Sequence, residues 1–299
     1  MNRENKYIIL CRLCLQNCKA ARIRNYSCRK SKHTYTQHQL IAMYALMKYT
    51  KSHYRDIVEL LEVMPEIKQV LGFDELPHFT TTQKFIQKFG CVKINRLLKA
   101  QTNHIQEAIL GIDASGFSSD YASKYYTLRI KGVVSIKRCV KNTICIDAFK
   151  QMIVSSIVSI GPKNDNRDFI PVLQKSATQP VVVVADKGYD ANKNHKYVDS
   201  IGSVSMIPVK KNVRRGKYRW KMHAKFTELV YHRRSLTETV FSVIKRKFSE
   251  SVYAKKEEMQ IVEVAFMNFV YFETCFKSLK RTSCIGFMTT CTGWFKCRL

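Results

Sequence analysis

Acidic residues are scarce in this 299-residue sequence, in which 23 aspartates and glutamates stand against 51 lysines and arginines. The formal net charge is therefore +28, and the basic surplus is spread along the chain instead of being confined to one tail. Such a surplus repels itself unless a polyanion lies nearby, so the charge favours a nucleic-acid partner whose phosphates supply most of the affinity. A basic protein without a polyanionic partner, and one attracted to anionic membranes, are the alternatives.

Long uninterrupted apolar runs are also missing. The most apolar late segment, residues 261–276, is interrupted by Glu263, Asn268 and Glu273, so it predicts a buried helix and not a membrane span. The opening apolar stretch, residues 7–10, is too brief for a signal peptide. We therefore expect the 11 cysteines, an odd number, to be free thiols in a reducing cytosol.

Hydrophobic residues make up 45% of the chain, which permits a sizeable core and argues against disorder for most of it. The length fits one catalytic domain with a smaller helical one, and we find no internal repeat. We expect four segments: a basic, cysteine-containing arm (1–35), a helical and probable DNA-binding domain (36–106), an α/β catalytic domain (107–280), and a tail without assignment (281–299).

The first segment is basic and is expected to be irregular. Its Cys11 and Cys14 have the spacing of zinc ligands, but Cys18 and Cys28 do not repeat it. A zinc site and unpaired cysteines in a mobile arm both remain open at this point.

The interval 36–106 predicts helices, because apolar residues recur at helical spacing at 40–47, 54–61 and 67–71. Leu76-Pro77-His78 breaks the pattern, and Thr80–Thr82 supply N-caps for a further helix through Phe89. Short helices joined by tight turns suit a DNA-binding unit, and a helical brace packed on the next domain is an equal alternative.

From about residue 107 the pattern changes to that of strands. The continuous apolar run 181–184 predicts a strand buried on both faces. Strands followed by alternating helix and strand indicate an α/β sheet domain. We expect strands at 109–112, 126–134, 142–149, 152–159, 181–184 and 204–208, helices at 165–174, 190–200, 230–250 and 257–279, and a basic insertion at 209–228.

The helix expected near 230–250 carries chemistry along one stripe. At 100° per residue, Tyr231, Arg234, Glu238 and Lys245 fall within about 60° of arc. Val240, Val243 and Ile244 lie largely off the stripe and would anchor the helix to the sheet. The alternative is that Arg234 and Glu238 form only a surface salt bridge, worth a few tenths of a kcal/mol.

Two aspartates accompany this stripe. Asp186 follows a buried strand, where α/β sheets place their sites, and Gly188 allows a sharp turn after it. Asp113 lies within or at the end of an apolar strand, where a carboxylate is costly unless it is paired or binds a metal. A capping role for Asp186 and a solvent position for Asp113 are the alternatives.

Asp113, Asp186 and Glu238 lie on separate elements and are oxygen ligands of the kind that Mg²⁺ prefers. Two such ions could clamp the attacking and leaving oxygens of a phosphodiester, while nearby lysines and arginines hold the flanking phosphates. The candidate chemistry and the charge therefore indicate the same substrate.

These residues carry a resemblance to the insertion-sequence transposases of bacteria and archaea that have an Asp-Asp-Glu catalytic domain. The last helix of that family carries Tyr-x2-Arg-x3-Glu-x6-Lys, which Tyr231, Arg234, Glu238 and Lys245 match in identity and spacing. The segments 111–117 and 185–190 resemble the surroundings of the family's first and second aspartates, and 54–57 and 76–81 resemble the region before its catalytic domain. The resemblance covers about residues 35–280, and no family pattern fits the residues outside that range.

The resemblance implies a ribonuclease-H-like (retroviral-integrase-like) catalytic domain with an N-terminal helical domain. It also implies Mg²⁺ (or Mn²⁺) bound by Asp113, Asp186 and Glu238, terminal inverted repeats and target DNA as double-stranded partners, and a homodimer in the active complex. Such a protein would be cytoplasmic and associated with a prokaryotic nucleoid. The expected DNA contacts are Tyr231, Arg234, Lys245 and Lys187, with Arg214, Arg215 and Lys217 from the basic insertion.

Three rival interpretations stay open: an inactive or domesticated relative that binds DNA without cutting it, a nuclease on the same fold that never joins strands, and a zinc-bound nucleic-acid adaptor. The three intact carboxylates weigh against the first. Joined product in a strand-transfer assay would exclude the second, and the third requires stoichiometric zinc.

Overall fold

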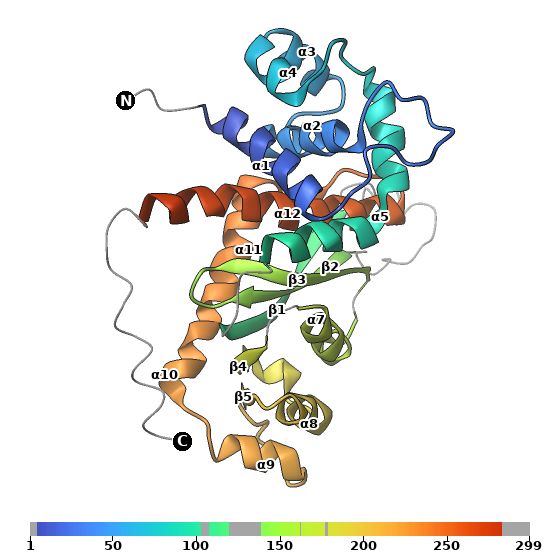
Figure 1. Ribbon diagram of the computed structural model, residues 1–299. Coiled ribbons are helices and arrows are strands. Elements are labelled where there is room, and N and C mark those ends of the chain that lie inside the picture. The colour runs from blue at the N-terminus through green and yellow to red at the C-terminus, as the bar shows by residue number, and fades with distance from the viewer. Residues whose placement is uncertain (1–4, 103–107, 120–138, 162, 177–178, 283–299) are drawn as a thin grey trace, which may run out of the picture.

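The computed structural model describes residues 5–102, 108–119, 139–161, 163–176 and 179–282 (Figure 1). Its described part contains a mixed six-stranded sheet in the order β3-β2-β1-β4-β5, with β6 beside β1. Strand β2 is antiparallel to both β1 and β3, whereas β4 and β6 pair with β1, and β5 with β4, in parallel. The strands are β1 (Ala108–Ser119), β2 (Cys139–Asp147), β3 (Met152–Ile160), β4 (Pro180–Ala185), β5 (Val204–Met206) and β6 (Ser251–Val252).

Both faces of the sheet are covered, which explains the valine-rich sequence of β4. Val183 and Ala185 pack on one face with α7 (Phe169–Lys175) and α8 (Asn192–Ser200). On the other face, Val182 and Val184 form a small apolar cluster with Ile109, and Val240 and Ile244 of α11 (Ser235–Lys247) lie in the main core. The predicted α/β class and the doubly buried strand are confirmed.

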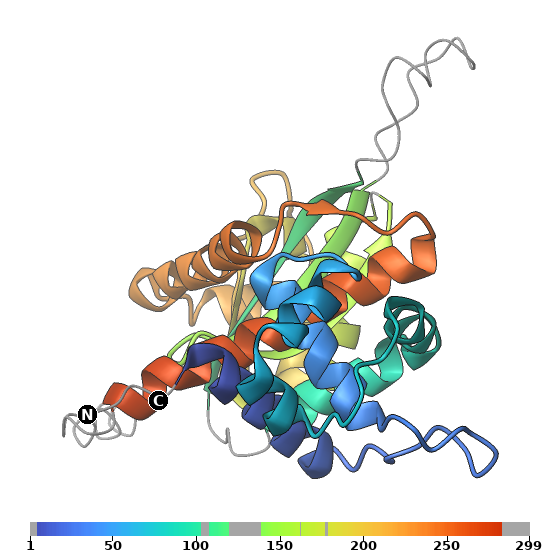
Figure 2. The same cartoon turned by 90° about the horizontal axis from the view of Figure 1, so that it is seen from above.

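The helical part precedes the sheet in the chain. It comprises α1 (Lys6–Ala20), α2 (Gln37–Thr50), α3 (Asp56–Glu62), α4 (Pro65–Leu71) and α5 (Phe79–Thr102), with α5 kinked at Gly90, whose φ is 70°. These helices lie against a long later helix, α12 (Glu257–Thr282) (Figure 2), and share one apolar core with it and with β2 and β3. Tyr44 of α2, for example, meets Phe266 of α12 edge to face at 4.7 Å between ring centroids. The helical part therefore braces the sheet through α12, while its role in DNA binding and the four segment boundaries stay predictions.

The expectation of an irregular arm before residue 35 is wrong for Lys6–Ala20, which form α1. Cys11, Cys14 and Cys18 recur at helical spacing and are fully buried. Buried thiols behave as small apolar side chains. The three cysteines therefore complete the apolar face with which α1 packs on the other helices.

The helix predicted at 230–250 is interrupted. It consists of α10 (Glu228–Tyr231), a 3-10 turn (His232–Arg234) and α11, which ends at Lys247. Further 3-10 turns precede α7 (Asp165–Arg167) and α8 (Lys187–Tyr189), and the basic insertion contains α9 (Lys217–His223). The strand predicted at 126–134 and the tail from residue 283 lie outside the described residues.

In the part of the chain that the structure describes, we find no helix with the length and apolarity needed to cross a bilayer. The late apolar segment is indeed a buried helix, α12, and its polar interruptions are paired. Asn268 exchanges amide hydrogen bonds with Asn142 of β2, and Glu263 pairs with Lys48 of α2 at 2.5 Å.

Candidate active site

The pairing of β1 with β4 brings the two aspartates together. Ile112 pairs with Ala185 in the parallel ladder, so Asp113 and Asp186 are the next residues on neighbouring strands. Because side chains alternate between faces, Asp113 shares the face of Ile109 and Gly111, and Asp186, still in extended backbone, shares that of Val184. Both carboxylates therefore lie on the face that α11 covers.

Helix α11 approaches this face at Gly111. A Cβ atom at residue 111 would lie 2.7 Å from Cγ2 of Thr237, closer than real Cβ contacts allow. Thr237 is fully buried, and its hydroxyl donates to the carbonyl of Arg234 at 2.7 Å. The next residue, Glu238, is thereby held beside Asp113, and both side chains line a pocket of about 360 Å³ with Lys245.

The environment of Asp113 is crowded with negative charge. The pKa of its carboxyl is raised to about 6, mainly by burial; the Ala114 amide and Arg234 lower this pKa, while Glu238 and Asp186 add to the rise. The Ala114 amide donates to Asp113 Oδ1 at 2.8 Å. Asp113 therefore interacts electrostatically with both other predicted carboxylates.

The predicted stripe is brought to the same place. Arg234 pairs with Glu238 at 2.8 Å, so the expected salt bridge exists, but Arg234 also lies in the field of Asp113 and Asp186. Burial raises the pKa of the half-buried Tyr231, and Asp186 adds to this effect against Arg234. The salt bridge is therefore part of the carboxylate site and not a separate surface feature.

The cations expected to bind DNA divide into two groups. Lys245 lines the carboxylate pocket with its ammonium 5.6 Å from the ring centroid of Phe117, and the half-buried Lys187 directly follows Asp186. Arg214, Arg215 and Lys217 are exposed on the basic insertion and do not line that pocket.

The donor chemistry of the site suits a divalent metal, since three carboxylates repel one another in a partly buried space and a cation relieves that repulsion. Among the described residues, however, no three histidine, cysteine or acidic side chains stand ready to hold an ion as a group. The Glu238 carboxylate is ion-paired with Arg234, which explains why it does not form a ready ligand group with the two aspartates. The same finding leaves the zinc adaptor without support: burial raises the pKa of Cys11 to about 12, and that of Cys14 well above its usual value, which opposes their ionisation as ligands.

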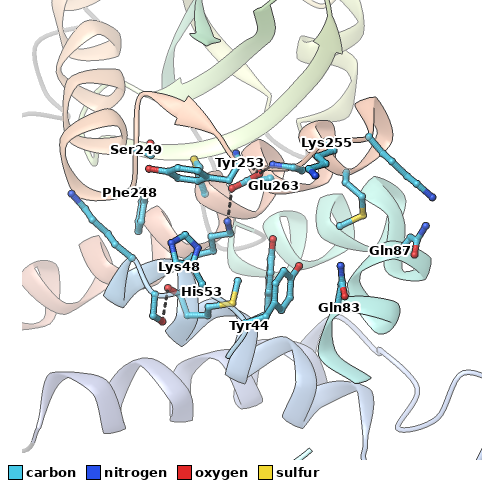
Figure 3. Close-up of a pocket in the computed structure, with 18 residues that line it drawn as sticks. Tyr44, Lys48, His53, Gln83, Gln87, Phe248, Ser249, Tyr253, Lys255 and Glu263 are labelled. Atoms are coloured by element: carbon cyan, nitrogen blue, oxygen red, sulfur yellow. Dashed lines mark hydrogen bonds and ion pairs between the residues drawn. The ribbon is translucent and has the colours of Figure 1, made fainter. Parts of the chain in front are cut away.

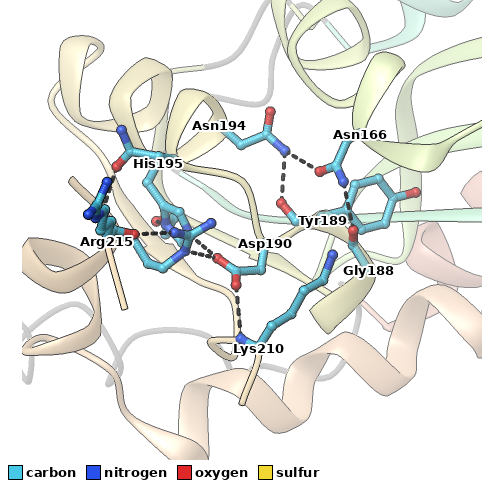
Figure 4. Close-up of polar contacts among 11 residues, drawn as sticks. Asn166, Gly188, Tyr189, Asp190, Asn194, His195, Lys210 and Arg215 are labelled. Atoms are coloured by element: carbon cyan, nitrogen blue, oxygen red, sulfur yellow. Dashed lines mark hydrogen bonds and ion pairs between the residues drawn. The ribbon is translucent and has the colours of Figure 1, made fainter. Parts of the chain in front are cut away.

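Sequence reasoning missed a buried network that holds the loop after Asp186 (Figure 4). Asp190 accepts hydrogen bonds from Arg219 Nε at 2.5 Å and the Lys210 amide at 2.9 Å, and contacts His195 Nε2 at 3.1 Å. The other nitrogen of His195 meets the Ser205 hydroxyl at 2.7 Å. All four side chains are buried, so this serine, histidine and aspartate are closed to substrate and act structurally.

Two cations of the basic insertion are paired with carboxylates of the protein itself. Arg219 is engaged by Asp190, and Lys221 pairs with Asp199 at 2.7 Å, so neither stands free for phosphate. These two ion pairs were not predicted, because composition does not show which carboxylate an arginine or lysine meets after folding. The network instead ties the insertion to the loop that carries Asp186.

Tyr189 lies under the site. Burial strongly raises the pKa of its phenol, and Asp165, Asp113, Asp168 and Asp186 raise it further. Its hydroxyl is buried, and no hydrogen-bond partner for it lies among the described residues. The backbone around it is fixed by amides (Figure 4): Asn194 donates to the Tyr189 carbonyl at 2.8 Å, and Asn166 to that of Gly188 at 2.9 Å.

Comparison with known proteins identifies a family for the chain. The family model of the transposase DDE domain matches residues 109–272, more than half of the 299-residue chain. The match begins in β1, ends in α12 and includes Asp113, Asp186 and Glu238. No curated protein and no solved structure matched the chain. On the family model, the chain belongs to the transposase DDE domain family.

Proposed function

We propose that the protein is a DNA transposase that cleaves DNA at the ends of an element and joins the freed strand to target DNA. The observation that carries this proposal is the register of β1 and β4, which sets Asp113 beside Asp186, together with the Gly111–Thr237 contact that brings Glu238 to them. Membership of the family indicates transposase-type DNA recombination. The terminal inverted repeats and the joining step are part of the proposal.

Asp113, Asp186 and Glu238 would hold Mg²⁺ or Mn²⁺. When bound, such ions lower the pKa of a water that attacks the phosphodiester and stabilise the charge on the reacting oxygens. Lys245, within the pocket, and Arg234, beside it, would bind the flanking phosphates, and Tyr231 would donate a hydrogen bond to one of them. Lys187 directly follows Asp186 in the chain and would bind a phosphate near that carboxylate.

The order of the strands supports a ribonuclease-H-like fold for the catalytic domain. Among the described strands, three antiparallel ones are followed by two parallel ones; Asp113 lies on β1, and Asp186 directly follows β4. The glutamate comes from α11, which packs on the aspartate face. This arrangement is the one that the resemblance implies for both aspartates and the glutamate.

Double-stranded DNA is the proposed partner, with a homodimer in the active complex. The exposed Arg214, Arg215 and Lys217 lie in a segment that the Asp190–Arg219 pair ties to the Asp186 loop, so DNA bound there would be registered against the site. The net charge of +28 supports phosphate contacts as the main source of affinity. A prokaryotic cytoplasm with nucleoid association is the proposed location.

The test is cleavage of a DNA fragment that carries the inverted repeats flanking the gene, with Mg²⁺ or Mn²⁺. Wild type is compared with Asp186→Asn and with a matched control, Asp199→Asn, which removes a carboxylate that pairs with Lys221 away from the site. We expect cutting at the repeat ends by wild type and the control, and none by Asp186→Asn.

Three outcomes separate the candidates. Cutting followed by joined product in a strand-transfer assay supports a transposase. Cutting without joined product indicates a nuclease on the same fold. Binding of the repeats without cutting by any variant indicates an inactive DNA-binding relative and overturns the proposal.

A further inference from the structure

A second pocket, of about 630 Å³, lies between the helical part and the end of α11 (Figure 3). Its walls are the end of α2, the start of α5, the chain from 248 to 256 and α12. It is larger than the carboxylate pocket of about 360 Å³ and falls in the size range of small-molecule sites. None of the residues that the proposed catalysis uses lines it.

The pocket is basic. Four lysines line it, Lys48, Lys51, Lys255 and Lys256, against one carboxylate, Glu263. That carboxylate is neutralised within the protein, because Oε1 pairs with Lys48 at 2.5 Å while Oε2 accepts the Tyr253 and Ala254 amides at 3.2 and 3.0 Å. A positive surplus therefore faces the cavity, as an anionic ligand such as a phosphate requires.

The pocket also carries an aromatic platform. Tyr253 is 52% exposed although its backbone is pinned by Glu263, and the His53 ring meets it edge to face at 5.8 Å. An exposed ring on a fixed turn suits base stacking, because little conformational freedom is lost when a base covers it. Gln83 and Gln87 on α5 add exposed amides that can donate to and accept from the edges of a base.

The two pockets adjoin one short segment of chain. Arg246 and Glu250 line the carboxylate pocket, whereas Phe248 and Ser249 line the second one. Lys51 bridges them, since its ammonium donates to the carbonyl of Arg246 at 3.0 Å. The last three residues of α11 are basic, so a polyanionic strand can pass from one pocket to the other over positive charge.

We propose that the second pocket binds an unpaired nucleotide of the DNA strand that passes the carboxylate site, with its base stacked on Tyr253 and its phosphate held by Lys51 and Lys256. The identity of the strand rests on the proposed function. The binding itself does not, because rings, amides and lysines recognise a single-stranded nucleotide whether or not the protein cuts DNA.

The experiment measures fluorescence anisotropy of a short, labelled single-stranded thymidine oligonucleotide and of a duplex, with the full chain and without metal. Tyr253→Ala is expected to weaken oligonucleotide binding about tenfold, while duplex affinity changes less than about twofold. Tyr253→Phe keeps the ring and is expected to bind like wild type. Lys256→Gln is expected to weaken oligonucleotide binding more than Lys68→Gln, a matched control on α4 outside the pocket.

The outcomes distinguish this proposal from the proposed function. Oligonucleotide binding that Tyr253→Ala leaves intact, or weakens no more than duplex binding, overturns the pocket even if DNA is cleaved. Selective loss in Tyr253→Ala supports the pocket even if no cleavage is found. Thymidine monophosphate that competes as well as the oligonucleotide at equal nucleotide concentration would show a free nucleotide to be the ligand and would overturn the assignment to a strand.

Discussion

Gly111→Ala is the sharpest test of how the fold builds the site. The added Cβ would lie 2.7 Å from Thr237 Cγ2, 3.4 Å from Ile146 Cγ1 and 3.6 Å from Val184 Cγ2. Only the first contact is prohibitive, and Thr237 is fully buried on a packed helix, so α11 must shift away from β1. Overpacking of this kind costs about 1–3 kcal/mol, offset by up to about 1 kcal/mol from the lower flexibility of alanine in the unfolded chain.

The same shift would move Glu238 away from Asp113, so metal-dependent cleavage should fall more than stability alone explains. Thr237→Ser removes Cγ2 and keeps the hydroxyl that donates to the Arg234 carbonyl. We therefore expect Gly111→Ala with Thr237→Ser to regain both stability and cleavage, with a coupling of about 1–2 kcal/mol in a double-mutant cycle.

The measurements are urea unfolding and cleavage of repeat-end DNA for wild type, the two single variants and the double variant. Thr237→Ser alone should lose about 1 kcal/mol for the missing buried methyl. Additive effects of the two substitutions would refute the reasoning, because they would show that residue 111 and Thr237 do not compete for the same space.

Four further changes probe other parts of the structure. Glu238→Gln should abolish cleavage and largely preserve DNA binding in a gel-shift assay, and undiminished cleavage would contradict the site. Arg219→Ala should lower the free energy of unfolding in urea by about 3 kcal/mol, because the buried Asp190 carboxylate loses its ion pair with the guanidinium. Lys217→Ala, at an exposed position, should change it by no more than about 0.5 kcal/mol. Burial raises the pKa of Glu273 from 4.5 to about 7, so this residue binds its proton more tightly in the folded state. Its contribution is fully favourable below pH 4.5 and is lost as pH rises through about 7, a fall of about 3 kcal/mol that Glu273→Gln should remove in unfolding titrations. Tyr189→Phe should leave stability unchanged or raise it by up to about 1 kcal/mol, since its buried hydroxyl has no hydrogen-bond partner among the described residues, and a clear loss in unfolding would contradict this.

The sequence alone predicted those elements whose apolar residues follow a regular pattern within one short segment. The four valines of β4 and the apolar period of α11 are local patterns, so the strand and helix were found, and the sheet class followed from their order. Val240 and Ile244 are buried as predicted. The break at His232–Arg234 was not predicted, because a 3-10 turn keeps nearly the same side-chain period as an α-helix over three residues.

Contacts between distant segments escaped prediction. Asp190 and Arg219 are 29 residues apart, and Gly111 and Thr237 are still more distant, so no periodicity connects them. For α1, the cysteines were read as candidate zinc ligands or loose thiols, whereas their burial against the other helices gives them an apolar role. Each of these outcomes depends on which surface a residue meets after folding, which a local pattern does not contain.

Arg234 links the electrostatics of the site to its substrate. In a protein of net charge +28, the carboxylate site is locally acidic, and Arg234 is ion-paired within it, at 2.8 Å from Glu238. The pair is a partly exposed one, so its own contribution to stability is small. If Glu238 instead binds a divalent cation, Arg234 loses its partner at the place where a phosphate must lie. The guanidinium would then exchange a carboxylate for a phosphate, so metal binding and DNA binding at this site should each strengthen the other.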